Sequence, residues 1–577
     1  MKRNANFAII AISLLAALIV PLPLSAQHTR YKLIDLGTLG GPLSSTSEAQ
    51  ARVLNNRSMV VGGADTSTPN PNVSNPCLFC SPDLFLRHAF QWRKDGLIDL
   101  GALPGANSSF AGAVNENGLS VGWSSDNDHM DPLLGIPQMH ATSWKNGEII
   151  DLGTLEGGYE SVALAANSRG QIVGVSANLV SDPFGPLGTE NRIFLWQNGV
   201  IEDLNTLGGP DAGFLDLVGE VAINERGQVV ACSYTDSTAN KVTGTPTLDP
   251  FLWQDGTMRD LGTLGGASGC ATALNNRGQV VGYSNLAGDL TFHAFFWDRG
   301  ALNDLGTFGG ENALALSIND AGHIVGRAAA ICTDCPPGNQ KQLHHPFVWK
   351  NGVMTDLGLI AGDTSGTAFS INSKNQIVIS STKCIHIRPD DSCDGLRYHA
   401  VLWENDAVFD LQTLIDGDSE LTVNNATNIN ERGEIAGTGV LPNGDTHAFV
   451  LVPCEGDGPC NHTASATVPS QVSPVSALAN RTSAKQNGES GRINSMWRLH
   501  ARDRMPSASG VSAGSDDPQP TNDWPLVNRI VTPQPVSSTA QKCIPYGSQC
   551  TLGGGFGKIH CCSGLTCAYC GLRDCCL

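Results

Sequence analysis

One sequence unit recurs eight times between Tyr31 and Cys454. It reads roughly as Asp-Leu-Gly-Thr-Leu-Gly-Gly, then Ala-x-x-Ile-Asn-x-x-Gly-Gln-Ile-Val-Gly, then His-Ala-Phe-x-Trp. Its Asp residues, 44 to 64 positions apart, are Asp35, Asp99, Asp151, Asp203, Asp260, Asp304, Asp356 and Asp410. A period of this length is typical of solenoids and propellers, whose units bury their apolar faces only against neighbouring units. The repeat therefore predicts one array over residues 31–453, whereas the length alone would suggest several domains.

Each unit predicts four short strands. The first carries small residues, which suit the crowded centre of a ring: Ala51, Ala111, Ala163, Ala271, Ala315, Ala368 and Ala426. In most units a second small residue stands two positions later, as in Ala113 and Ser317, so we expect small side chains on alternate positions of this strand. Glu220 replaces the alanine in the fourth unit, and we expect it to project into the central channel.

An asparagine follows the first strand in every unit. These residues are Asn55, Asn115, Asn167, Asn224, Asn275, Asn319, Asn372 and Asn430. A glycine stands three positions later except at Ser58 and Asn375. Asn hydrogen-bonds its own backbone and Gly supplies a positive φ, so the pair predicts a tight hairpin turn.

The third strand ends in a tryptophan in seven units. These are Trp92, Trp144, Trp196, Trp253, Trp297, Trp349 and Trp403, and we expect them to wedge one sheet against the next. The last unit lacks a fourth strand, while residues 31–35 supply one at the N-terminus. The sequence thus predicts an all-β, eight-bladed β-propeller of four-stranded blades closed by the N-terminal strand. An open β-solenoid is the alternative.

The repeated segments of the chain resemble those of a known family. The Asp-Leu-Gly-Thr-Leu-Gly-Gly and His-Ala-Phe-x-Trp segments are similar to the HAF-repeat family of extracellular proteins, across all eight units. The resemblance implies an extracellular repeat protein and no defined biochemical activity.

The net charge and the N-terminal sequence limit the expected binding partners and the expected location of the protein. The net charge of -19 argues against nucleic acid, which needs clustered Lys and Arg, and disfavours anionic membranes. Lys2 and Arg3, an apolar run and Ser25-Ala26 predict a signal peptide over residues 1–26. No later stretch is long enough to span a membrane, and the 18 cysteines fit an oxidising compartment. We therefore expect a secreted monomer.

The repeated polar residues favour structural roles. His88, His140, His293, His345, His399 and His447 lie on the third strand, where equivalent positions diverge too far to share a metal ion. We expect each to hydrogen-bond within its blade, to the repeated Asp where it can reach. The Asp-Leu-Gly-Thr segment offers too few oxygens for calcium, and the sequence has neither a His-Glu-x-x-His motif nor a phosphate loop. We predict no catalytic residues, cofactor or metal.

Loop length concentrates between strands two and three. The long loops are 65–86, 125–139, 177–190, 234–248, 328–344 and 381–397. Insertions on one face commonly mark a binding face. We expect local disulfides to pin these loops, with candidates Cys77, Cys80, Cys332, Cys335, Cys384 and Cys393. Cys454 with Cys460 would tie off the ring, and Cys232 and Cys270, in adjacent units, are a further candidate pair.

The C-terminal part differs in composition. Residues 454–541 are rich in Ser, Ala, Pro and Thr, which predicts a flexible linker. Residues 542–577 hold Cys543, Cys550, Cys561, Cys562, Cys567, Cys570, Cys575 and Cys576, so the segment needs disulfides to be stable. The spacing resembles cystine-knot miniproteins (knottins). That resemblance implies Cys543–Cys562 and Cys550–Cys567 pairing and leaves the partner of Cys561 among the last three; metal binding by this cluster is an alternative.

The sequence favours a non-catalytic binding protein. The long-loop face would contact an extracellular protein or glycan, and the knottin-like tail would add a second binding module. The alternative is a secreted polysaccharide lyase or hydrolase with its site at the channel mouth. It would have to use scattered loop residues such as Asp126, Asp128, His129, Asp390 and Asp391.

Overall fold

The structure is a computed structural model. It describes residues 29–46, 52–71, 84–105, 107–131, 135–155, 157–185, 188–213, 221–331, 342–387, 393–454, 460, 567–570 and 573–576. The chain divides into two units, Met1–Ser490 and Gly491–Leu577, which are taken separately.

Each of the first four repeats contributes four antiparallel strands. Those of the first three form separate four-stranded sheets, whereas a parallel bridge between Leu248 and Ser268 joins the strands of the fourth repeat to those of the fifth in one eight-stranded sheet. The first is β2 (Gly40–Ser45), β3 (Val60–Pro69), β4 (Phe85–Arg93) and β5 (Gly96–Gly101). The second is β6 (Ser109–Val114), β7 (Ser120–Met130), β8 (Pro137–Lys145) and β9 (Glu148–Gly153). The third is β10 (Ser161–Ala166), β11 (Ile172–Ser181), β12 (Thr189–Gln197) and β13 (Val200–Asp203). The fourth is β14 (Ala222–Ile223), β15 (Val229–Tyr234), β16 (Leu248–Gln254) and β17 (Thr257–Asp260).

The remaining repeats follow the same order. The fifth is β18 (Gly265–Leu274), β19 (Val280–Leu286), β20 (Phe292–Asp298) and β21 (Ala301–Asp304). The sixth is β22 (Gly309–Ile318), β23 (Ile324–Ile331), β24 (Gln342–Lys350) and β25 (Val353–Asp356). The seventh is β26 (Ser365–Ile371), β27 (Ile377–Ile387), β28 (Cys393–Glu404) and β29 (Ala407–Asp410), followed by the short helix α1 (Leu411–Leu414). The eighth is β30 (Thr422–Ile429), β31 (Ile435–Val440) and β32 (Thr446–Pro453), completed by β1 (Tyr31–Asp35).

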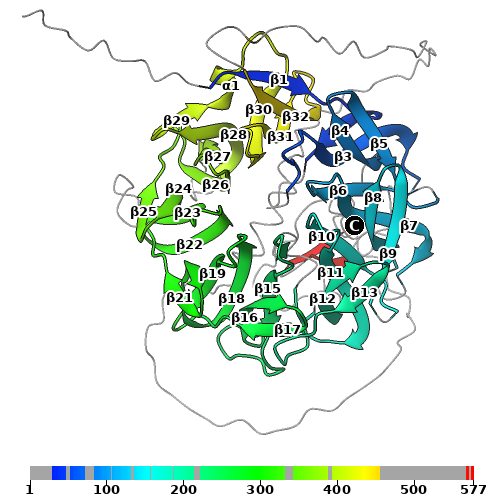
Figure 1. Cartoon of the computed structure of the whole chain (residues 1–577), viewed down its shortest axis with the longest axis vertical. Helices are drawn as coiled ribbons and strands as arrows, with labels where there is room; N and C mark the ends of the chain where they lie inside the picture. The colour runs from blue at the N-terminus through cyan, green and yellow to red at the C-terminus, as the bar shows by residue number, and fades with distance from the viewer. Residues whose placement is uncertain are drawn as a thin grey trace, which may run out of the picture. The chain divides into compact units, whose positions relative to one another are not determined.

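The sheets follow one another around a ring, as Figure 1 shows. The first strand of each repeat lies innermost and contacts the first strand of the next, for example β6 with β10 and β18 with β22. The N-terminal strand β1 pairs with β32 from Tyr31↔Pro453 to Asp35↔Phe449, as the sequence predicted. The fold is an all-β propeller, and each set of four antiparallel strands is called a blade below, numbered in chain order.

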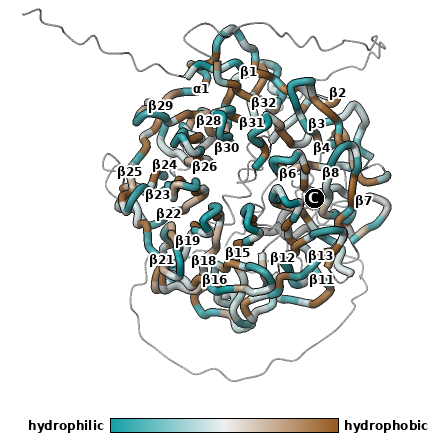
Figure 2. The backbone as a smooth tube through the Cα atoms, in the orientation of Figure 1, coloured by the Kyte–Doolittle hydropathy of each residue, from teal (hydrophilic) through white to brown (hydrophobic). Residues whose placement is uncertain are grey.

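The core lies between adjacent blades. Ala141 of blade 2 packs in one cluster with Phe194 of blade 3, and Trp92 and Trp144 share another. Five of the seven repeated tryptophans are less than 9% exposed, and Arg259 of blade 4 lies over the Trp297 ring of blade 5. The tryptophans therefore contact the neighbouring blade, as predicted. Figure 2 shows apolar and polar stretches alternating along the tube within the blades.

A bulge corrects the expected spacing of small residues on the innermost strand. In β6 the register shifts between Ala111 and Ala113, and β10, β18, β22, β26 and β30 shift at the matching place. The small residues therefore do not follow simple alternation. The bulge brings a carbonyl onto the facing glycine of strand two, where a Cβ on Gly122 would lie 1.9 Å from the Phe110 oxygen. A side chain at Gly122 would therefore require the bulge to move, although blade 7 has Ile379 facing the same bulge. The sequence analysis gave this glycine no role.

The described part of the second unit is a small hairpin. β33 (Cys567–Cys570) pairs with β34 (Arg573–Cys576), which places Cys567 opposite Cys576. Cys543, Cys550, Cys561 and Cys562 lie outside the described residues, as does the signal-peptide segment. The cystine-knot resemblance and the signal peptide remain predictions. Among the described residues, no helix is long and apolar enough to cross a membrane.

Candidate functional site on the loop face

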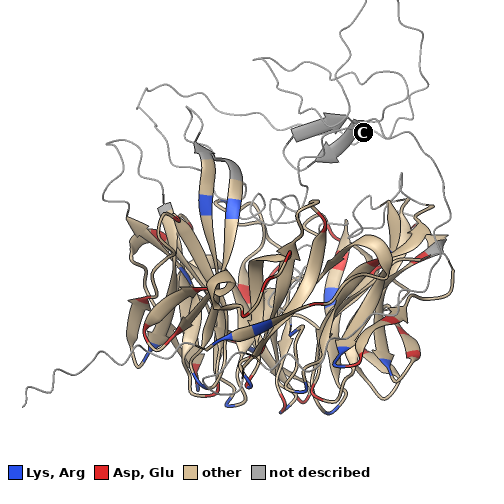
Figure 3. Cartoon of the chain, turned by 90° about the horizontal axis from the view of Figure 1, so that it is seen from above, with Lys and Arg blue, Asp and Glu red and all other residues tan. Residues whose placement is uncertain are grey.

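Strand direction gives the ring two different faces, which Figure 3 shows from the side. The turns after strand one, such as 55–59, and after strand three, such as 145–148, lie on one face, called the turn face. The connections between strands two and three lie on the other, called the loop face. Their described residues are 70–71, 84, 131, 135–136, 182–185, 188, 235–247, 287–291 and 441–445, and the strands extend further into these connections than the sequence predicted.

The turn face is built from the repeated asparagines. Asn275 Oδ1 accepts the N–H groups of Arg277 and Gln279, and the residue at the expected glycine position has a positive φ in all eight turns, including Ser58 and Asn375. The predicted turn chemistry is therefore confirmed.

The same asparagines also join the blades to one another. Each Nδ2 donates to the backbone oxygen of the next asparagine at 2.7–3.1 Å, and the eight bonds run Asn55, Asn115, Asn167, Asn224, Asn275, Asn319, Asn372, Asn430 and back to Asn55. Every asparagine is less than 9% exposed. This closed chain of hydrogen bonds is a second closure of the ring, separate from the β1–β32 pairing, and sequence reasoning missed it.

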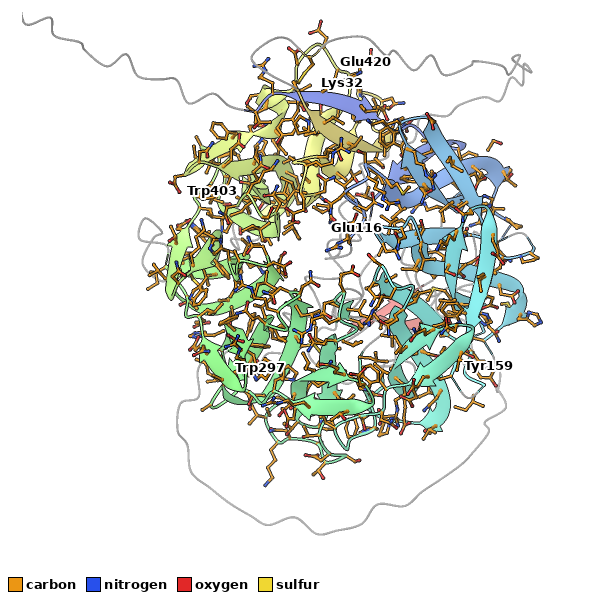
Figure 4. The ribbon with its side chains drawn as sticks, in the orientation of Figure 1. Lys32, Glu116, Tyr159, Trp297, Trp403 and Glu420 are labelled. Carbon is orange, nitrogen blue, oxygen red and sulfur yellow. A yellow bond between two sulfur atoms is a disulfide. The ribbon has the colours of Figure 1, made fainter. Side chains whose placement is uncertain are left out.

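The residue after each asparagine alternates between neutral and acidic around the ring. The order is Asn56, Glu116, Ser168, Glu225, Asn276, Asp320, Ser373 and Glu431. Each carboxylate accepts the N–H and the side-chain donor of the preceding neutral residue; for Glu116 these bonds are 3.1 and 2.9 Å. Glu116 lies at the inner edge of the ring in Figure 4. The side chains of these eight residues are therefore used in joining blades.

The repeated His and Asp residues pair across strands three and four. His88 with Asp99, His140 with Asp151, His293 with Asp304, His345 with Asp356 and His447 with Asp35 approach within 2.7–3.1 Å. Burial alone would lower the pKa of His140, but its hydrogen bond to Asp151 raises that pKa. Burial would likewise raise the pKa of Asp151, whose bond to His140 lowers it. The predicted within-blade role is confirmed for these five residues.

Three blades depart from this pairing. His399 binds Asp363, which precedes β26, while Asp410 accepts the Gln412 N–H and caps α1. His399 thus has a hydrogen-bond partner just before its own blade's first strand, but that partner is not the repeated Asp. Blade 3 carries Arg192 at the histidine position, 4.0 Å from Asp203. Blade 4 carries Asp249, whose pKa is raised to about 7 by burial and by the facing Asp260.

The loop face is where exposed apolar side chains gather. Among the described residues, eight of the eleven exposed large hydrophobic side chains lie on it: Leu84, Met130, Leu179, Val180, Val242, Leu290, Ile331 and Ile385. They come from seven consecutive blades, and none is aromatic. Of the other three, Ile98 lies on the outermost strand β5, and Val200 and Val353 begin β13 and β25 at the turns after strand three. Apolar surface concentrated on one face is typical of a protein interaction site.

Disulfides support part of the loop-face prediction. Cys232 and Cys270 are bonded and join blade 4 to blade 5. Cys454 is bonded to Cys460, as expected. Cys384 is in a disulfide near the end of the β27–β28 hairpin, and the side chain of its expected partner Cys393 is not described. Cys77, Cys80, Cys332 and Cys335 lie outside the described residues.

The structure describes only some of the residues that the sequence offered as candidates for catalysis. His129 Nδ1 lies 2.7 Å from Asp126 Oδ2 at the exposed end of the β7–β8 hairpin. Glu220, Asp390 and Asp391 lie outside the described residues, and the side chain of Asp128 is not described. Within the described ranges, no group of three or more His, Cys, Asp or Glu side chains could hold a metal ion.

Two boundaries between adjacent blades, called seams below, contain buried carboxylates on the loop face that sequence reasoning missed. One lies between blades 2 and 3 and the other between blades 3 and 4. Glu160 Oε2 accepts the Met139 N–H at 3.0 Å, and Asp211 Oδ1 accepts the Asn191 N–H at 2.7 Å. Burial, together with the nearby Asp131, raises the pKa of Glu160 to about 9. Burial raises the pKa of Asp211 to about 8. The hydrogen bond from the Asn191 N–H lowers this pKa, and the nearby Asp182 raises it further.

No protein-family model and no curated protein matches the chain. Solved structures with some similarity include the β-propeller domain of the Trilobed protease from Pyrococcus furiosus (8% identity, TM-score 0.35, covering 62% of this chain and 98% of that one). A puromycin-hydrolyzing peptidase from Mycobacterium tuberculosis shows 12% identity and a TM-score of 0.35, covering 72% of this chain and 62% of that one. A PL25 ulvan lyase shows 9% identity and a TM-score of 0.30, covering 59% of this chain and 91% of that one. At this level of similarity the chain is placed in no family.

Proposed function

We propose that the chain is a secreted, non-catalytic binding protein that contacts an extracellular protein or glycan through the loop face. The observation that carries this proposal is the gathering of exposed aliphatic and methionine side chains on that face. A soluble protein that exposes such residues in seven consecutive blades exposes surface that an interaction would bury.

The contrast with the turn face supports the same assignment. There, the carboxylates of Glu116, Glu225 and Glu431 are already bound by donors of the neighbouring blade. A partner would have to displace those hydrogen bonds, whereas the aliphatic side chains of the loop face contact it without breaking any. The cysteine-rich tail would supply a second binding module, and a linker long enough to span both sites would raise avidity.

The test is a binding screen of the full secreted chain against extracellular proteins and glycans, followed by two matched triple variants. Leu84→Ser, Leu290→Ser and Ile331→Ser remove loop-face side chains that are 56–63% exposed. Ile98→Ser, Val200→Ser and Val353→Ser remove outer-strand side chains that are 44–65% exposed. We expect the first set to weaken binding about tenfold or more and the second to leave it unchanged. Equal losses would place the binding surface elsewhere.

A further inference from the structure

The two carboxylate seams recur at adjacent blade boundaries with the same construction. In blade 2, Asp131 stands in the β7–β8 connection and faces Glu160, which precedes β10. In blade 3, Asp182 stands in the β11–β12 connection and faces Asp211, which precedes β14. Each aspartate is followed by proline in the sequence, Pro132 and Pro183.

These four carboxyl groups are buried. The exposed fractions are 3% for Asp131, 0% for Glu160, 2% for Asp182 and 0% for Asp211. Asp182 Oδ1 accepts the Phe184 N–H, while Asp182 Oδ2, Asp211 Oδ2 and Glu160 Oε1 have no hydrogen-bond partner. Two ionised carboxylates can only accept, so no hydrogen bond joins them until one is protonated.

At other seams, the N–H group of strand three is bound by a side chain that is not a carboxylate. The matching strand-three N–H of Arg87 is bound by Ser108 Oγ, that of Phe292 by Asn312 Oδ1 and that of His344 by Ser365 Oγ. An uncharged oxygen binds the strand-three N–H there. The acidic residue at Glu160 and Asp211 therefore adds a second oxygen, which faces the aspartate of the preceding connection.

Several charged side chains lie near these two blade boundaries. Glu190 lies near Asp211 and adds negative charge. Its own oxygen is already bound by Arg192 Nη2 at 2.7 Å and by Asn178 Nδ2 at 2.9 Å. On the blade 2 hairpin, His129 binds Asp126 and His140 binds Asp151. Calcium takes six to eight oxygen ligands, more than two carboxylates supply, and a proton needs only two oxygens.

We propose that a proton shared between Asp131 and Glu160, and another shared between Asp182 and Asp211, anchor two connections of the loop face to the next blade. The loop face is then ordered in acidic surroundings and loosens at these two places as the pH rises. The regulatory consequence, stronger partner binding at acidic pH, rests on the proposed function; the anchoring itself does not.

The test is hydrogen exchange of the full chain at pH 5 and pH 9, corrected for the intrinsic rate. Peptides covering 126–139 and 178–191 should lose protection at pH 9. The 285–292 connection is the internal control, because Asp289 Oδ1 is bound there by the N–H of Ala267 and by Asn285 Nδ2. A uniform pH effect on all three connections would overturn the proposal.

The double variant Glu160→Gln and Asp211→Asn sharpens the test. Each amide keeps an oxygen for the strand-three N–H and offers its own N–H to the facing aspartate. Protection should then stay at the acidic level at both pH values. Two results would overturn the proposal: an unchanged pH response in this variant, or millimolar calcium restoring protection of the wild type at pH 9. Because neither readout needs a partner, failure of the proposed function would not affect them.

Discussion

The turn face and the loop face are built from the same hairpins, yet they treat polar groups in opposite ways. On the turn face, eight asparagines donate around a closed ring, and four carboxylates are bound by donors of the preceding blade. On the loop face, carboxylates meet in pairs and aliphatic side chains are exposed. The difference teaches that the repeated positions maintain the ring, while departures from the repeat mark the candidate function.

The largest expected difference between the faces is in pH dependence. The folded-state pKa values of Glu160, Asp211 and Asp249 are about 9, 8 and 7, above the unfolded values near 4. Stability from these groups is complete below about pH 4 and declines as the pH rises through those values. The raised pKa values of His140 and His345 act in the same direction.

Below about pH 4 the lowered pKa values of Asp99, Asp151 and Asp356 reverse the trend, because stability is lost as these groups are protonated. Urea unfolding should therefore show a maximum between about pH 4 and 6 and a loss on the order of several kcal/mol by pH 9. In Glu160→Gln with Asp211→Asn that loss should shrink. A maximum near pH 8 would contradict the assignment.

The next effect concerns the turn face. Asn275→Ala removes the bonds to Arg277, Gln279 and Asn319 and leaves a buried gap in the ring. We expect the free energy of unfolding to fall by about 2–4 kcal/mol. Asn303→Ala, on the exposed outer strand β21, is the control and should cost less than about 0.5 kcal/mol. Similar losses in the two variants would show that the asparagine ring adds little.

A smaller effect is expected from the His–Asp pairs. His293 is 17% exposed and bonded to Asp304, so His293→Ala should lower the free energy of unfolding by about 0.5–1 kcal/mol. His129→Ala removes a pair in which the histidine is 69% exposed and should leave the urea midpoint unchanged. An unchanged midpoint for His293→Ala as well would refute the stabilising role of the repeated histidine.

The smallest effect on stability is expected at the exposed aliphatic residues. The triple variant Leu84→Ser, Leu290→Ser and Ile331→Ser should leave the melting temperature within about 1–2 °C of the wild type, since these side chains bury little surface. Thermal unfolding by circular dichroism measures this. A large drop would mean that the residues pack within the fold and would remove the reason to regard them as a contact surface.

The sequence predicted the architecture well because each repeated column reports a local requirement. Asn-x-x-Gly indicates a turn whatever surrounds it, and the surplus strand at residues 31–35 matches the strand missing from blade 8. The bond from Asn430 to Asn55 was not predictable, because it depends on how neighbouring blades are aligned in space. The partner of His399, Asp363, was not predictable either, because it lies in the connection between β25 and β26 and not in the repeated motif.

The candidate site could be predicted only in outline. Loop length indicated the face on which exposed apolar side chains gather, but the exposure of Leu290 or Ile385 depends on the positions of surrounding loops. Glu160 and Asp211 lie outside the repeated motif, and only the structure places them against Asp131 and Asp182. Their signal in the sequence was faint: an acid where other blades carry Ser108, Asn312 or Ser365, following an Asp-Pro pair in the preceding connection.

The most direct test of the division between faces is hydrogen exchange of the full chain with and without a captured partner. We predict protection in the connections 126–139, 178–190, 234–248 and 285–292, with no change in the turns 115–119, 224–228 and 275–279. Protection confined to those turns, or to the outer strands around Val200 and Val353, would contradict the assignment of binding to the loop face.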